Sequence, residues 1–132
     1  MEQNTVEKIM DLSTATAREK AEELIRILYE KLALDIRFVD VSSSSEITDY
    51  YIITTGRSTT HVKSLADEIQ FEAERRCIPF HHMEGRDGAM WLLLDFCDVI
   101  VHVFTKDARE NYQIERLFKD ENFVDISNLI GE

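Results

Sequence analysis

Two pairs of side chains in this sequence have spacings that could support catalysis. Asp95 and Asp98 form a D-x-x-D pair, and paired carboxylates can hold the two metal ions of phosphoryl transfer. Ser58 and His61 are three residues apart, but nucleophilic catalysis also needs an orienting acid and an oxyanion hole. A turn expected between the two aspartates points them in different directions, and a helix cap with an exposed histidine explains the second pair. We therefore expect no catalytic site.

Metal ligation is the second kind of chemistry that the residue types suggest. Cys77 and Cys97 are the only cysteines and form no C-x-x-C motif, which favours free thiols in a reducing compartment. His81 and His82 are adjacent on an expected strand, so they face opposite ways and cannot easily share one metal ion. A site that combines one of them with His102 is a weak alternative. We expect no metal and no other cofactor.

The length and charge of the chain limit its class. Its 132 residues suit one domain, and its 26 acidic and 15 basic residues give a net charge of -11. Direct DNA binding is not expected, because it needs clustered Lys and Arg and the densest basic spot is Arg75-Arg76. No signal core or membrane-length apolar run is apparent, so we expect a cytoplasmic protein without a membrane partner. The acidity either steers the chain towards a basic protein or only keeps it soluble.

Hydrophobic periodicity predicts a mixed α/β (α+β) domain in the order α-β-β-α-β-β-β-α. Thr16 and Glu19 have capping-box spacing before an amphipathic helix. The elements expected after it are strands at 36–41 and 50–55, a helix from Ser58 to about Arg76, a strand at 80–84, a hairpin within 88–104 and a helix at 108–118. We expect one mixed sheet with packed helices, an N-terminal extension at 1–15 (a short helix or a loose arm) and an acidic tail at 119–132 (a frayed helix being one alternative).

The most apolar run, Gly88 to Phe104, carries a tryptophan, an aspartate and a histidine within expected strands. A two-residue turn at Cys97-Asp98 pairs Trp91 with Phe104 and Leu93 with His102. One face is then wholly apolar and should lie under the helices: Leu92, Leu94, Phe96, Val99, Val101 and Val103. The other face mixes large apolar and polar groups, as binding surfaces do: Trp91, Leu93, Asp95, Ile100, His102 and Phe104. A second buried layer, in which Asp95 and His102 satisfy each other or the backbone, remains open, and so does pairing with a second copy.

Three segments of the sequence resemble the ribosomal silencing factor family, also called the Iojap or YbeB family. They are SSSSEITDYYIITTGRSTTHVKSLADEI, MEGRDGAMWLLLDFCDVIVHVF and ARENYQIERLF, within about residues 17–118. The matching positions are Asp49, Gly56, Ser58, His61, Val62, Glu84, Gly85, Trp91, Asp95, Asp98, Val99, Val101, His102, Phe104, Arg109, Tyr112, Glu115 and Leu117. The chain departs from the pattern where Cys97 replaces glycine, Ile114 replaces leucine and Phe118 replaces tryptophan.

The resemblance implies a nucleotidyltransferase-like fold without catalytic carboxylates, in a silencing domain at 16–118. It implies a non-enzymatic, often homodimeric repressor of translation that binds the large ribosomal subunit through its fourteenth ribosomal protein and blocks subunit joining. The surface that binds this partner is expected to include Trp91, Leu93, Asp95, Ile100, His102, Phe104, Glu84, Gly85 and Met90. Structural roles are expected for Asp49, Gly56, Ser58, Arg109 and Tyr112.

Two alternative functions remain open. Gly56-Arg57-Ser58 is similar to the Gly-Ser of nucleotidyltransferases, although those enzymes also need paired aspartates on a following strand. A nucleotidyltransferase-like enzyme would bind Mg²⁺ and a nucleotide. The other alternative is a homodimerisation module, in which the face that carries Trp91 pairs with its copy and meets no ribosome.

Overall fold

Two helices begin where the capping residues predict. In the computed structural model, which describes residues 6–131, α1 (Ala17–Glu30) follows Thr16, and the side chains of Thr16 and Glu19 each accept the other's backbone N–H. This is the predicted capping box. α2 (Thr59–Arg75) follows Ser58, whose Oγ accepts the N–H of His61 at 3.1 Å. Among the described residues, no helix is long and apolar enough to cross a membrane.

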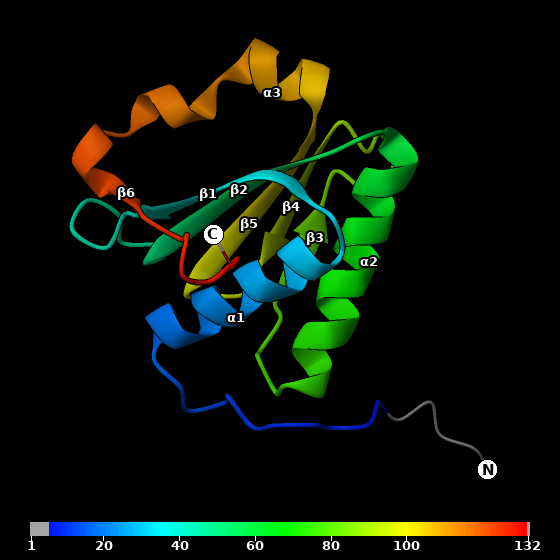
Figure 1. Ribbon diagram of the computed structural model, residues 1–132, viewed down its shortest axis with the longest axis vertical. Coiled ribbons are helices and arrows are strands. Elements are labelled where there is room, and N and C mark those ends of the chain that lie inside the picture. The colour runs from blue at the N-terminus through cyan, green and yellow to red at the C-terminus, as the bar shows by residue number, and fades with distance from the viewer. Residues whose placement is uncertain (1–5, 132) are drawn as a thin grey trace.

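The strands form one mixed sheet, which confirms the expected α/β class. Within residues 6–131, the strands lie side by side in the order β3-β4-β5-β2-β1-β6, with β2 and β5 paired in parallel and the other neighbours antiparallel. Both helices pack over the same face of this sheet (Figure 1). The six strands are β1 (Leu34–Asp40), β2 (Tyr50–Gly56), β3 (His82–Glu84), β4 (Trp91–Asp95), β5 (Val99–Thr105) and β6 (Phe123–Val124).

The prediction of a last helix at 108–118 is wrong in its extent. α3 (Lys106–Tyr112) begins after Thr105, which caps it by accepting the N–H of Ala108, and it ends at Gln113. Gln113 has a left-handed backbone with φ of 46°, so the helix cannot continue through it. The chain resumes as the short 3-10 helix η1 (Ile114–Leu117).

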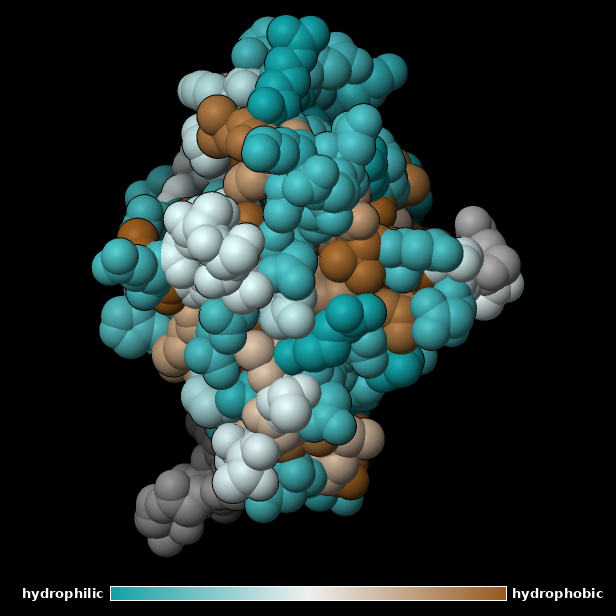
Figure 2. Space-filling view, turned by 90° about the vertical axis from the view of Figure 1, so that its left-hand side faces the viewer, coloured by the Kyte–Doolittle hydropathy of each residue, from teal (hydrophilic) through white to brown (hydrophobic). Residues whose placement is uncertain are grey.

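The C-terminal segment, expected as an acidic tail, belongs to the sheet and is not a frayed helix. After the 3-10 helix η2 (Asp120–Asn122), β6 pairs with β1 and covers its edge. Three apolar side chains beyond β6 pack against the main core, which is the apolar cluster between the sheet and helices α1 and α2: Ile126, Leu129 and Ile130. The side of the molecule where β6 lies is mostly hydrophilic, with apolar groups in separate small patches (Figure 2).

The N-terminal extension has no helix in its described part. Residues 6–12 run past the end of α2, where the N–H groups of Ile9 and Leu12 donate to the carbonyls of Arg75 and Arg76 at 2.7 and 2.8 Å. Leu12 packs against the main core. The segment is therefore a fixed arm over that part, while residues 1–5 lie outside the described residues, as does Glu132.

Candidate partner-binding face

The hairpin of β4 and β5 has the register predicted from its sequence. Trp91 pairs with Phe104, Leu93 with His102, and Asp95 with Ile100. The apolar face is buried under α1 and α2, as expected, through Leu92, Leu94, Phe96, Val99, Val101 and Val103. The mixed face therefore lies on the other side of the sheet.

This mixed face is divided between a buried and an open half. On β5, Ile100, His102 and Phe104 are only 8%, 6% and 0% exposed. Phe104 belongs to a second apolar cluster together with Ala108 of α3, and Ile114, Phe118 and Phe123 pack against this cluster. On β4, Trp91, Leu93 and Asp95 remain half-buried. The hypothesis of a second buried layer therefore describes β5, whereas the hypothesis of an accessible binding surface describes β4.

Trp91 is held in place from three sides. Its indole Nε1 donates a hydrogen bond of 3.1 Å to Nδ1 of His102. Its ring stacks on Phe104 with a centroid distance of 5.0 Å and meets the ring of Tyr112 at 4.7 Å. A half-exposed aromatic ring that is already fixed can bind a partner at little cost in conformational entropy.

Tyr112 extends the open half of the face, although only a structural role was expected for it. Its side chain is 59% exposed while its ring contacts Trp91. The sequence feature that could have indicated this role for Tyr112 is the lack of a connecting loop between β5 and α3, which keeps the helix near the end of the strand. Met90, one of the predicted partner-binding residues, is 56% exposed beside Trp91 in the chain.

A shallow depression of about 370 Å³ lies next to Trp91. Four residues predicted to bind the partner line it: Glu84, Gly85, Trp91 and Leu93. They come from β4 and from the end of β3, which pairs Glu84 with Leu93. An aromatic side chain beside a depression is the arrangement that protein interfaces use for their anchoring contacts.

Asp95 and His102 do not bond to each other, so that part of the buried-layer alternative is wrong, but Asp95 does bond to the backbone. Oδ1 of Asp95 accepts the N–H of Cys97 at 2.7 Å and so closes the hairpin turn. Oδ2 lies 3.6 Å from Nδ1 of His81 and 3.7 Å from Nδ1 of His82. The expectation that these two histidines face opposite ways is also wrong, because β3 begins only at His82 and strand alternation does not extend to His81.

Burial keeps His102 neutral. Its Nδ1 accepts the Trp91 hydrogen bond, so the proton of the neutral ring sits on Nε2, which has no hydrogen-bond partner within residues 6–131. Desolvation of the charged form lowers the pKa of His102 from 6.5 to about 4. Protonation would also displace the indole donor, so the position of Trp91 depends on this neutral imidazole.

The buried His102 predicts a loss of stability in mild acid. The unfolded chain binds a proton at this residue below pH 6.5, whereas the folded chain does so only near pH 4. The free energy of unfolding should therefore fall by roughly 3 kcal/mol between these pH values, in addition to the effects of other groups. Chemical denaturation at several pH values measures this change. The free energy of unfolding should depend less on pH in His102→Gln than in the wild type, and an equal pH dependence would contradict the prediction.

Three residues expected to be structural serve the approach to α2 and the turn before β2. Gly56 packs closely on the first turn of the helix, because a Cβ there would lie 2.9 Å from Cγ2 of Val62. Ser58 caps the helix, as predicted. The backbone of Asp49 donates to the carbonyl of Asp98 at 3.0 Å and so joins the strand start to the hairpin turn.

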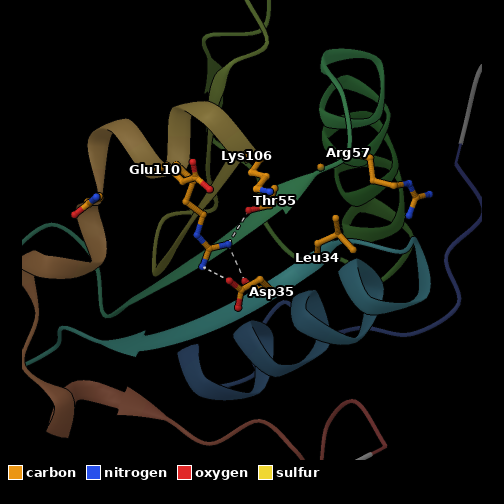
Figure 3. Close-up of a pocket in the computed structure, with 9 residues that line it drawn as sticks. Leu34, Asp35, Thr55, Arg57, Lys106 and Glu110 are labelled. Carbon is orange, nitrogen blue, oxygen red and sulfur yellow. Dashed lines mark hydrogen bonds and ion pairs between the residues drawn. The ribbon is translucent and has the colours of Figure 1, made fainter.

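Arg109 is buried and is one of the residues that line a separate pocket of about 720 Å³ (Figure 3). Its guanidinium donates to Thr55 Oγ1 and to the carbonyl of Asp35, both at 2.8 Å, and pairs with Glu115 at 2.7 Å. These bonds join α3 and η1 to β1 and β2. The polar groups that Figure 3 joins by dashed lines thus hold the fold together, which agrees with the structural role expected for Arg109.

The chain is thus an α/β domain with a candidate binding face around the fixed side chain of Trp91. Comparison with known proteins identifies its family. The family profile described as "Ribosomal silencing factor during starvation" matches residues 14–131. This chain belongs to the ribosomal silencing factor family.

Individual relatives agree with this assignment. The Bacillus subtilis "Ribosomal silencing factor RsfS" is 40% identical over 97 residues, or 74% of this chain and 82% of the relative. A mouse relative, "Mitochondrial assembly of ribosomal large subunit protein 1", is 30% identical over 105 residues, or 77% of this chain and 46% of its own length. A crystal structure from Chromobacterium violaceum matches with a TM-score of 0.75 at 30% identity and covers 77% of this chain and 85% of that one.

Proposed function

We propose that this chain is a cytoplasmic, non-enzymatic repressor of translation. It binds the large ribosomal subunit through the fourteenth ribosomal protein of that subunit and blocks joining of the small subunit. The observation that supports this proposal is the fixed, half-exposed Trp91 beside the depression lined by Glu84, Gly85 and Leu93, in a chain whose relatives are named as ribosomal silencing factors.

The shape and chemistry of the face suit a protein partner. Interfaces are enriched in aromatic residues and methionine, and the open half presents Met90, Trp91 and Tyr112 around a polar edge formed by Glu84 and Asp95. The net charge of -11 favours a basic partner, and ribosomal proteins that contact RNA are basic.

The geometry gives little support to the nucleotidyltransferase alternative. A two-metal site needs two carboxylates that converge on the same ions. Asp95 lies on the mixed face with His81 and His82, whereas Oδ2 of Asp98 lies 3.5 Å from Nζ of Lys20 on α1, over the opposite face. The two aspartates of the D-x-x-D pair therefore face different sides of the sheet.

Co-sedimentation with purified ribosomal subunits tests the proposal. The chain should pellet with large subunits and not with small ones, and prior binding should lower the yield of joined ribosomes when small subunits are added. A folded chain that pellets with neither subunit from a matched source would contradict the proposal.

A homodimer through the same face is the competing use of Trp91. Analytical ultracentrifugation of the wild type and of Trp91→Ala separates the two uses. If the face served only dimerisation, the variant would become monomeric and the wild type would not bind large subunits. If it serves the ribosome, the variant loses subunit binding whatever its oligomeric state.

A further inference from the structure

We propose that His81, His82 and Asp95 form a binding site for one Zn²⁺ ion at the β3–β4 edge of the sheet. The two imidazole nitrogens and the carboxylate oxygen converge on one point, with all three ligand atoms within 4.8 Å of one another. This site shares Asp95 and Glu84 with the proposed partner-binding face, but its test is metal binding by the chain alone, which does not depend on the proposed ribosomal function.

The spacing of the three atoms fits a zinc ion. Nδ1 of His81 and Nδ1 of His82 are 2.9 Å apart, and they lie 3.6 and 3.7 Å from Oδ2 of Asp95. A point equidistant from the corners of that triangle lies about 2.0 Å from each of them, which is the bond length of zinc to imidazole nitrogen and carboxylate oxygen. An ion can therefore enter with little movement of the three side chains.

The surrounding hydrogen bonds orient two of the three ligands. The carboxylate of Glu84 can only accept, so Nε2 of His82 donates to it across 2.7 Å and Nδ1 of His82 keeps a lone pair. Without metal, that lone pair accepts the hydrogen of His81 Nδ1, and a bound ion would take the place of this proton. Zinc-bound histidines commonly donate their other ring nitrogen to a carboxylate in this way. Oδ1 of Asp95 is held by the N–H of Cys97, which aims Oδ2 at the imidazoles.

The backbone explains why the site is built at this edge. β3 and β4 pair His82 with Asp95, and the N–H of His81 donates to the carbonyl of Asp95 at 2.8 Å. Both histidines are thereby tied to the residue that supplies the third ligand. The His81 side chain is 67% exposed, so an ion reaches the site from solvent, and water can fill its fourth position. Two imidazoles with one carboxylate favour Zn²⁺ over Mg²⁺ or Ca²⁺, which prefer all-oxygen sites.

Isothermal titration calorimetry with Zn²⁺ tests the site. The wild type should bind one Zn²⁺ per chain and show no binding of Mg²⁺. Asp95→Asn keeps an oxygen acceptor for the Cys97 N–H but loses the anionic ligand, and His81→Gln changes an exposed side chain. Each should weaken Zn²⁺ binding at least about tenfold, and Glu84→Gln should weaken it by about ten- to a hundredfold.

Asp87→Asn is the matched control, because Asp87 is an exposed carboxylate in the neighbouring turn and should not change the affinity. Circular dichroism checks that each variant is folded. Equal Zn²⁺ affinity in the wild type and Asp95→Asn would overturn the proposal. The absorption spectrum of the chain with Co²⁺ in place of Zn²⁺ gives a second check. A thiolate-to-Co²⁺ charge-transfer band would also overturn the proposal, because it would assign the ion to Cys77 or Cys97.

Discussion

Trp91→Ala is expected to lower the affinity of the chain for large ribosomal subunits by about thirtyfold or more. Central aromatic anchors of protein interfaces typically cost at least about 2 kcal/mol when truncated. Trp91 has the features of such an anchor, since His102 and Phe104 hold its ring in place and the same side chain lines the depression that Glu84 also lines. Quantitative co-sedimentation or surface plasmon resonance with immobilised large subunits measures the loss.

Two further variants make this result specific. Tyr112→Ala removes an exposed ring that contacts Trp91, and it should weaken binding less than Trp91→Ala while leaving the fold intact. Phe71→Ala is the control, because Phe71 is 47% exposed on α2, which packs over the other face of the sheet. A Trp91→Ala protein that is folded by circular dichroism and binds like Phe71→Ala would sink the assignment of this face.

The hairpin shows how far local rules extend. Alternation with a two-residue turn predicts both faces of β4 and β5 residue by residue, and the observed pairs Trp91–Phe104 and Leu93–His102 agree. Because successive side chains of a strand alternate between the two faces of the sheet, the position of the turn is enough to assign each residue of the hairpin to a face. The same rules could not tell whether the mixed face was covered, because its cover comes from α3 and residues 114–123, which are distant in the chain from β4.

The errors at the C-terminal end share a physical cause. Residues 108–118 have helical spacing, but Arg109 pairs with Glu115 across a left-handed Gln113, and this tertiary network outweighs the local preference for a continuous helix. β6 is two residues long and exists because the edge of β1 was open to it. The grouping of His81 with His82 was missed for a similar reason, since the exact start of β3 decides which way each ring points.

Gly85→Ala is expected to disrupt the edge of the candidate site and to lower the free energy of unfolding by about 2–4 kcal/mol. Gly85 has φ of +85°, a conformation that alanine adopts at a cost of about 1–2 kcal/mol. A Cβ on this residue would also lie 2.2 Å from the carbonyl oxygen of Trp91, so the backbone on one side must move. Gly85 therefore contributes to the face through the position it allows for Trp91, in addition to lining the depression.

Gly88→Ala in the same turn is the matched control. A Cβ on Gly88 would meet nothing within 4 Å, so its stability should stay within about 0.5 kcal/mol of the wild type. Urea denaturation followed by the emission of Trp91, the only tryptophan in the chain, reports both the stability and the environment of the face. A shifted native emission in Gly85→Ala alone would show that the turn positions the indole, whereas equal stability and emission in the two variants would refute that role.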